Sequence, residues 1–148
     1  MVISNQLELS VKKAQDINLI CPTIISQTVA AEAPNFDQSW CKEKIKPLFD
    51  VCHLVLDELK KLSDKMEVLI LNGLFYVWVK ITNSKQCKVK NDMSLVRTLI
   101  EEYHVVVMPR STFGIEVGMS LRIAYGALDT ASVAEGMGRL TKGLSDLL

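Results

Sequence analysis

The pattern of apolar and polar positions is clearest between residues 105 and 126. Four consecutive apolar residues, 105–108, predict a short strand buried on both faces. Pro109 ends this strand, because a prolyl ring cannot donate a hydrogen bond to a sheet. Apolar and polar residues then alternate over 119–124, which predicts a second strand. On this strand Arg122 shares a sheet face with two small residues, so its guanidinium has room for a planar anion.

Helical spacing predicts helices over residues 7–16, 23–33 and 93–103, and Asp129 is a suitable N-cap for a last helix. A longer helix begins near Asp37, and Pro47 inside it predicts a kink or a division near Ile45. The apolar stripe of this long helix recurs at spacings of three and four: Cys41, Ile45, Leu48, Cys52, Leu56, Leu59 and Leu62.

Residues 67–71 and 74–81 predict two further strands, joined at Asn72-Gly73 by a hairpin or a bulge. The last helix contains Gly136, Gly138 and Gly143, which helix propensity alone disfavours, so they indicate close approach to a neighbour. The order of elements predicts an α+β fold: a small antiparallel or mixed sheet covered on one face by helices.

Composition narrows the function classes. The 148 residues form one domain by length, and 17 basic residues balance 17 acidic ones, so no field favours nucleic acid or an anionic membrane. No apolar run is long enough to span a membrane, and the N-terminus lacks a signal-peptide pattern. Four cysteines without a C-x-x-C pair are typical of reduced thiols in a cytoplasmic protein, and two isolated histidines predict no metal site.

Arg122 has two interpretations from residue types alone. A guanidinium can bind a carboxylate through two parallel hydrogen bonds, which favours recognition of an acidic small molecule. An arginine in a half-buried strand more often pairs with an Asp or Glu of its own chain. The spacing leaves both interpretations open.

Three motifs carry a resemblance to a known family. They are P-R-S-T-F-G at 109–114 with L-R-I-A-Y-G at 121–126, then K-A-Q-D to S-Q over 13–27, and G-L-F-Y-V-W at 73–78. In this order they resemble the C-terminal portion of class I/II aminotransferases, which are pyridoxal-phosphate enzymes of fold type I. The family usually has glycine where this chain has Arg110. If that position requires a positive φ, arginine is strained there; otherwise the loop differs, or Arg110 makes a second anion contact.

The resemblance implies a domain organisation and a site. Residues 1–35 would come from the boundary of the large and small domains, and residues 36–148 would form the C-terminal small domain. The substrates would be an amino acid and a 2-oxo acid, and Arg122 would bind the substrate α-carboxylate. The protein would form a homo-oligomer such as a dimer, or it would pair with a large domain. The possible substrate-pocket residues are Gly73, Phe75, Tyr76, Arg110, Ser111 and Phe113.

The family's cofactor lysine lies in an S-x-S-K-type segment followed by G-x-R, and neither motif occurs here. Lys65 and Lys85 lie in polar turns, so we expect this chain not to hold pyridoxal phosphate covalently and to have no catalytic residue of its own. The leading hypothesis is an aminotransferase portion, with the aromatic strand favouring aromatic or methionine-like substrates. The alternatives are an inactive regulatory module that pairs with a complete aminotransferase subunit, and a carboxylate-binding domain of unrelated ancestry.

Overall fold

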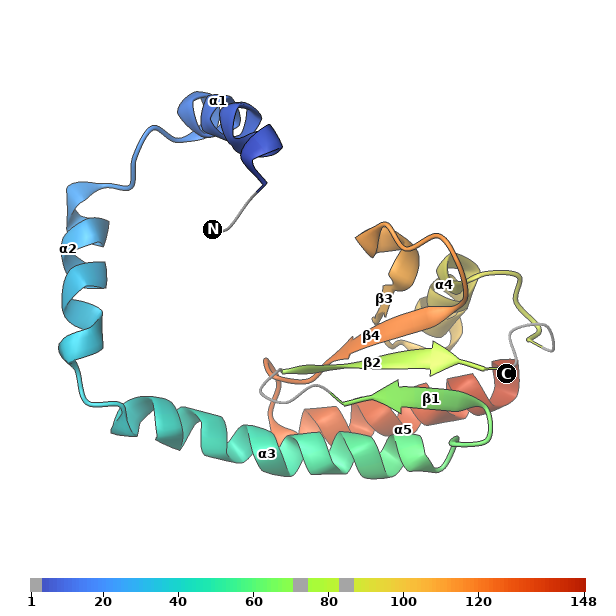
Figure 1. Cartoon of the computed structure of the whole chain (residues 1–148). Coiled ribbons are helices and arrows are strands. Elements are labelled where there is room, and N and C mark those ends of the chain that lie inside the picture. Colours follow the sequence, from blue (N-terminus) through green and yellow to red (C-terminus); the bar gives the residue numbers. More distant parts are fainter. Residues whose placement is uncertain (1–3, 71–74, 83–86) are drawn as a thin grey trace. The chain divides into compact units, whose positions relative to one another are not determined.

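The computed structural model describes residues 4–70, 75–82 and 87–148 and divides into two compact units, Met1–Cys41 and Lys42–Leu148. The first unit contains α1 (Glu8–Asn18) and α2 (Ile24–Glu32), with 3-10 turns at Asn5–Leu7 and Ala33–Asn35. The long helix α3 (Ser39–Lys60) spans the boundary between the units (Figure 1).

Local hydrogen bonds stabilise each of the two helices in the first unit. The Thr23 hydroxyl caps α2 by accepting from the backbone N–H of Ser26, and Lys12 pairs with Glu8 one turn away in α1. Neither helix buries a residue. Their large apolar side chains are exposed: Leu9, Ile17, Ile24, Ile25 and Val29.

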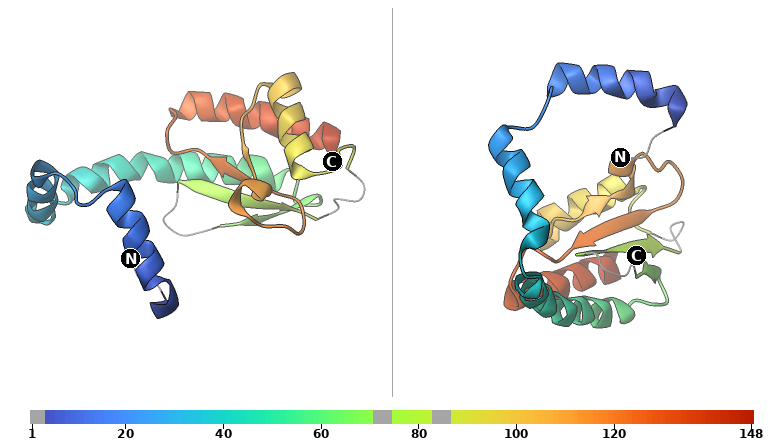
Figure 2. Two further views of the ribbon diagram at one scale, coloured as in Figure 1. Left: turned by 90° about the horizontal axis from the view of Figure 1, so that it is seen from above. Right: turned by 60° about the vertical axis from the view of Figure 1, so that its left-hand side comes forward.

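The second unit is built on a four-stranded antiparallel sheet with strand order β1-β2-β4-β3. The strands are β1 (Met66–Leu69), β2 (Tyr76–Ile81), β3 (Met108–Pro109) and β4 (Ser120–Ala124). Helices α4 (Asp92–Tyr103) and α5 (Thr130–Leu147) complete the unit. Figures 1 and 2 show α5 running along the sheet beside α3. The α+β prediction is confirmed.

The core lies between one face of the sheet and the helices. Alternation along β2 and β4 buries every second side chain, and these join residues of α3, α4 and α5 in one cluster. Each fully buried Leu or Val contributes about 1.5–3 kcal/mol. The opposite sheet face carries the other half of each strand, and it is less buried. The core residues of the strands are Val77, Val79, Ile81, Leu121 and Ile123.

The predicted strand over 105–108 is wrong in extent and in burial. Only Met108 and Pro109 pair with β4, and β3 is an edge strand, so a proline is tolerated in it. His104 ends α4 in the left-handed conformation with φ 54°, directly after the predicted helix 93–103. Residues 105–107 are not paired in the sheet, and Val106 is 76% exposed.

Pro47 does not divide the long helix, so of the two predicted outcomes, a kink or a division, the division does not occur. Helix α3 runs through it without interruption. The missing N–H leaves the carbonyl of Glu43 without a helical partner, and Glu43 is exposed, so water can satisfy it. The predicted junction at Asn72-Gly73 lies outside the described residues.

The glycines of α5 differ in what surrounds them, and we expect Gly143→Ala and Gly138→Ala to change the free energy of unfolding in opposite directions. A Cβ at Gly143 would lie 2.7 Å from Leu99 Cδ2 and 2.9 Å from Tyr103 Cγ, and such overpacking costs about 1–3 kcal/mol. A Cβ at Gly138 meets nothing within 4 Å, so alanine gains about 1 kcal/mol of helix propensity. Urea denaturation measures both changes; stabilisation by Gly143→Ala would contradict this account.

Candidate functional site

Arg122 lies near the middle of β4 on the less buried face of the sheet. Trp78 of β2 is its partner across one side of the strand, and Met108 of β3 is its partner across the other. Its guanidinium carbon lies 5.1 Å from the ring centroid of Tyr76 and 4.8 Å from that of Phe113. Both distances are within the range of a cation–π contact.

The charge of Arg122 has no acidic partner within the described residues. Its Nε is buried and makes no hydrogen bond there, and none of the ion pairs of that part of the chain includes it. The own-chain salt bridge that the sequence left open is therefore absent from the described residues. A buried donor without a partner is costly, so such a group is a candidate for binding a ligand.

Aromatic side chains surround this arginine. Trp78 and Phe113 meet edge to face with ring centroids 5.6 Å apart, and Phe75 meets Tyr76 in the same way at 5.6 Å. Phe75 is 58% exposed and Phe113 is 42% exposed, so both rings are accessible. The structure thus brings Tyr76 and Phe113 to Arg122, and it adds Trp78, which the prediction omitted although it lies in the aromatic motif.

Phe113 belongs to a 3-10 turn, η4 (Arg110–Phe113), which follows β3 directly. Asp92, the first residue of α4, is 3% exposed and anchors this turn. Its Oδ2 accepts the backbone N–H of Ser111 at 3.0 Å, and its Oδ1 accepts that of Met93 at 3.1 Å. Sequence reasoning missed Asp92, because an acidic residue in the first turn of a helix is ordinary there.

Arg110 pairs with Asp92. Its Nε lies 3.6 Å from Asp92 Oδ2, which is an ion pair but too long for a hydrogen bond, and its Nη1 donates to the carbonyl of Ile115. Its φ is not positive, since His104 is the one non-glycine residue with positive φ in the described part. The expected strain is absent, and the anion that Arg110 contacts is Asp92 of its own chain.

Of the three remaining predicted pocket residues, the structure describes two. Ser111 is exposed and contributes its backbone N–H to Asp92, and Phe75 lies next to Tyr76. Gly73 lies outside the described residues. Gly114 ends η4 with φ 73°, a conformation that favours glycine and fits the predicted F-G step.

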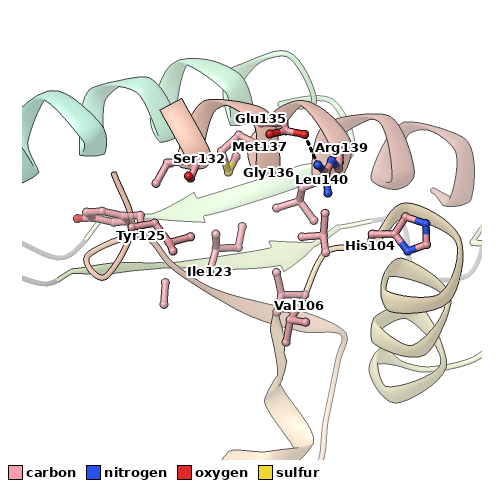
Figure 3. Close-up of a pocket in the computed structure, with 15 residues that line it drawn as sticks. His104, Val106, Ile123, Tyr125, Ser132, Glu135, Gly136, Met137, Arg139 and Leu140 are labelled. Carbon is pink, nitrogen blue, oxygen red and sulfur yellow. Dashed lines mark hydrogen bonds and ion pairs between the residues drawn. The ribbon is translucent and has the colours of Figure 1, made fainter. Parts of the chain in front are cut away.

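A separate pocket of about 370 Å³ lies on the other face of β4 (Figure 3). The chain leaving α4 forms one wall and α5 another, and Ile123 and Tyr125 contribute from the strand side. Burial and a hydrogen bond with Cys52 raise the pKa of the Tyr125 phenol, so it stays protonated. The pocket is mostly apolar, with the Glu135–Arg139 ion pair among its lining residues. Arg122 is not among its lining residues.

The described residues offer no set that fits pyridoxal phosphate, which needs a lysine, an acidic partner and phosphate donors. Every lysine there is exposed except Lys65, whose Nζ donates to the carbonyl of Ser145 at 3.1 Å. Lys80, on the sheet face of Arg122, lies 3.9 Å from Glu67. Lys85 lies outside the described residues. The same residues contain no cluster of three potential metal ligands and no helix able to cross a membrane.

Comparisons with known proteins show the family of this chain. The family model described as aminotransferase class I and II matches residues 2–140. The aromatic aminotransferase ISS1 of Arabidopsis thaliana is 32% identical over 136 residues, which cover 92% of this chain and 33% of that protein. An aspartate aminotransferase of Rhizobium meliloti strain 1021 is 30% identical over 127 residues, covering 81% of this chain and 30% of that protein.

Solved structures show the same fold. The aromatic aminotransferase of Pyrococcus horikoshii OT3 superimposes with a TM-score of 0.72 at 26% identity, over 90% of this chain and 35% of that one. The aspartate aminotransferase of Rhizobium meliloti superimposes with a TM-score of 0.73 at 26% identity, over 91% of this chain and 34% of that one. The chain spans about a third of the length of these relatives. This chain therefore belongs to the class I and II aminotransferases, fold type I proteins whose members use pyridoxal phosphate.

Proposed function

We propose that this chain supplies the substrate-carboxylate site of an aminotransferase that moves an amino group between an amino acid and a 2-oxo acid. The observation that carries the proposal is the Arg122 guanidinium, half-buried between aromatic rings and without an acidic partner among the described residues. Its planar fork can bind both oxygens of a carboxylate and so fix the orientation of the substrate.

The aromatic surroundings of Arg122 support a substrate with an aromatic or methionine-like side chain. Tyr76, Trp78 and Phe113 offer flat apolar surfaces beside the guanidinium. Two relatives are named aromatic aminotransferases, and others are named aspartate aminotransferases, so the names alone do not select the side chain.

We further propose that the chain works with a large domain outside these 148 residues. The exposed apolar side chains of α1 and α2 support this, because a contiguous exposed apolar patch marks an interaction surface. Residues 1–35 would lie at the domain boundary and residues 36–148 would form the small domain. The amino-transfer chemistry would come from pyridoxal phosphate in the complete protein. Dimerisation and a cytoplasmic location stay predictions.

The isolated chain is expected not to bind pyridoxal phosphate covalently, because every described lysine is exposed except Lys65, whose Nζ donates to the carbonyl of Ser145. Borohydride reduction of the chain with the cofactor, followed by peptide mapping, measures this. Scattered labelling of surface lysines is the expected result. A stoichiometric label on one lysine would show that this chain carries its own cofactor site.

The second candidate function, an inactive module that pairs with a complete aminotransferase subunit, rests on the same exposed helices. Mixing the chain with an aminotransferase subunit and measuring turnover distinguishes the catalytic portion from the regulatory module. A catalytic portion should restore activity to a subunit that lacks the corresponding third, whereas a regulatory module should change the activity of an intact subunit. Arg122→Ala should abolish the first effect and leave the second unchanged.

A further inference from the structure

We infer that Phe113 is a positioning residue for the carboxylate site: its ring fixes the guanidinium of Arg122, and Asp92 fixes the turn that carries Phe113. This inference rests on the proposed function for what the site binds. It goes beyond that proposal by assigning a positioning role to the Phe113 ring and to the buried carboxylate of Asp92.

The first step is the freedom of Arg122. An arginine side chain without a hydrogen-bond partner has many rotamers to lose when it binds a ligand, and immobilising such a side chain costs about 0.5–1.5 kcal/mol. The described residues give Arg122 no hydrogen bond or ion pair that would restrict it. The two ring contacts, with Tyr76 at 5.1 Å and Phe113 at 4.8 Å, are what hold its guanidinium before a ligand arrives.

The second step is the origin of the two rings. Tyr76 is fixed by the ladder between β2 and β4, in which it pairs with Ala124. Phe113 is not in a strand and is 42% exposed, so packing alone does not fix its ring. Its edge-to-face contact with Trp78 sets its orientation, and the turn below it sets its position.

The third step is the anchor of that turn. Asp92 is the first residue of α4, and a reciprocal capping box between Asn91 and Ser94 stabilises this start of the helix. From there its carboxylate holds the N–H of Ser111 at 3.0 Å, two residues before Phe113. The buried ion pair with Arg110 adds a second link between the same carboxylate and the turn. Helix α4 thus determines where the Phe113 ring lies.

The positioning can be measured without any ligand, on the 148-residue chain. Ring currents should shift the Arg122 Nε–H proton away from those of Arg97 and Arg139, and burial of Nε should slow its exchange with water. Arg122→Lys assigns the signal by removing it. Phe113→Leu should return the shift toward the other arginines, and Phe113→Tyr should keep it. Phe49→Leu, the same change at an exposed phenylalanine of α3, is the matched control and should have no effect.

The consequence for binding is measured with 3-phenylpropionate as the probe and 3-phenylpropanol as its uncharged control. In a Trp40→Phe background, Trp78 is the single tryptophan and reports on the site by fluorescence. Phe113→Leu should weaken binding of the acid about three- to tenfold, the share expected from lost pre-organisation of one side chain. Asp92→Asn should weaken it in the same direction, and Phe113→Tyr should restore the parent affinity.

The outcomes separate this inference from the proposed function. If the parent chain binds acid and alcohol alike, or does not bind the acid, the carboxylate role of Arg122 is wrong. If acid binding requires Arg122 but Phe113→Leu changes neither the Nε–H shift nor the affinity, the positioning role of Phe113 is overturned and the proposed function stands. A changed shift with reduced affinity in Phe113→Leu, unmatched by Phe49→Leu, supports the inference.

Discussion

Replacing Arg122 with alanine in a complete enzyme that carries this chain should lower kcat/KM for amino acids about 30- to several-thousand-fold. The physical reason is that the variant leaves the substrate carboxylate desolvated without its partner, which typically costs about 2–5 kcal/mol. Arg122→Lys keeps the charge but loses the planar fork, so it should recover only part of the loss. Steady-state kinetics on an amino acid and on its decarboxylated amine measure the effect.

The amine is the decisive comparison, because it has no carboxylate for Arg122 to bind. Its turnover should change little in Arg122→Ala. Arg139→Ala is the matched control: it removes a half-exposed arginine of α5 that pairs with Glu135, away from the aromatic face. Equal losses for amino acid and amine, together with a lower melting temperature, would make Arg122 a structural residue.

Asp92→Ala should destabilise the folded chain by about 3–5 kcal/mol, the cost of removing one member of a buried ion pair. Asp92 is 3% exposed, and the Arg110 side chain is 11% exposed, so the loss leaves a cation that water reaches poorly. It also leaves the N–H of Ser111 without its acceptor. Since domains are stable by only about 5–15 kcal/mol, urea denaturation should detect this change easily.

A double-mutant cycle identifies the cause of that loss. Arg110→Met in the Asp92→Ala background removes the unpaired charge, so it should restore part of the stability. Glu135→Ala breaks an exposed pair with Arg139 and should cost about 0–1 kcal/mol. If Asp92→Ala costs no more than Glu135→Ala, the ion pair and the anchored turn contribute nothing to stability.

The sequence predicted those parts of the fold that local patterns determine. The alternation over 119–124 matched β4, and the Asp129 cap of α5 is present, with its Oδ1 accepting the N–H of Ser132 at 2.9 Å. The stripe predicted for α3 was partly wrong, because Val51 and Val55 are buried while Cys41 and Ile45 are exposed. That helix has apolar residues on more than one side, so only contact with the sheet decides which side is buried.

For the candidate site, the family resemblance pointed to Arg122 and its aromatic neighbours, but not to what holds them. The pairing of Trp78 with Arg122 depends on strand register, which links residues 44 positions apart. The bond from Asp92 to Ser111 likewise joins a helix start to a turn 19 positions later. Such tertiary contacts leave no local pattern. The close approach predicted for three glycines holds for Gly143, whereas Gly136 and Gly138 meet no neighbour within the described residues.

The short length of β3 also bears on aggregation. A run of valines followed by methionine has high strand propensity and low charge, which is the composition of segments that recruit identical segments from other molecules. Of this run only Met108 lies in β3, at the edge of the sheet, where unpaired backbone groups could template such a union. His104 turns the chain before the run, and Pro109 ends it with a residue that cannot donate. At this edge of the sheet, these two residues leave only the two-residue strand β3 for a second chain to extend.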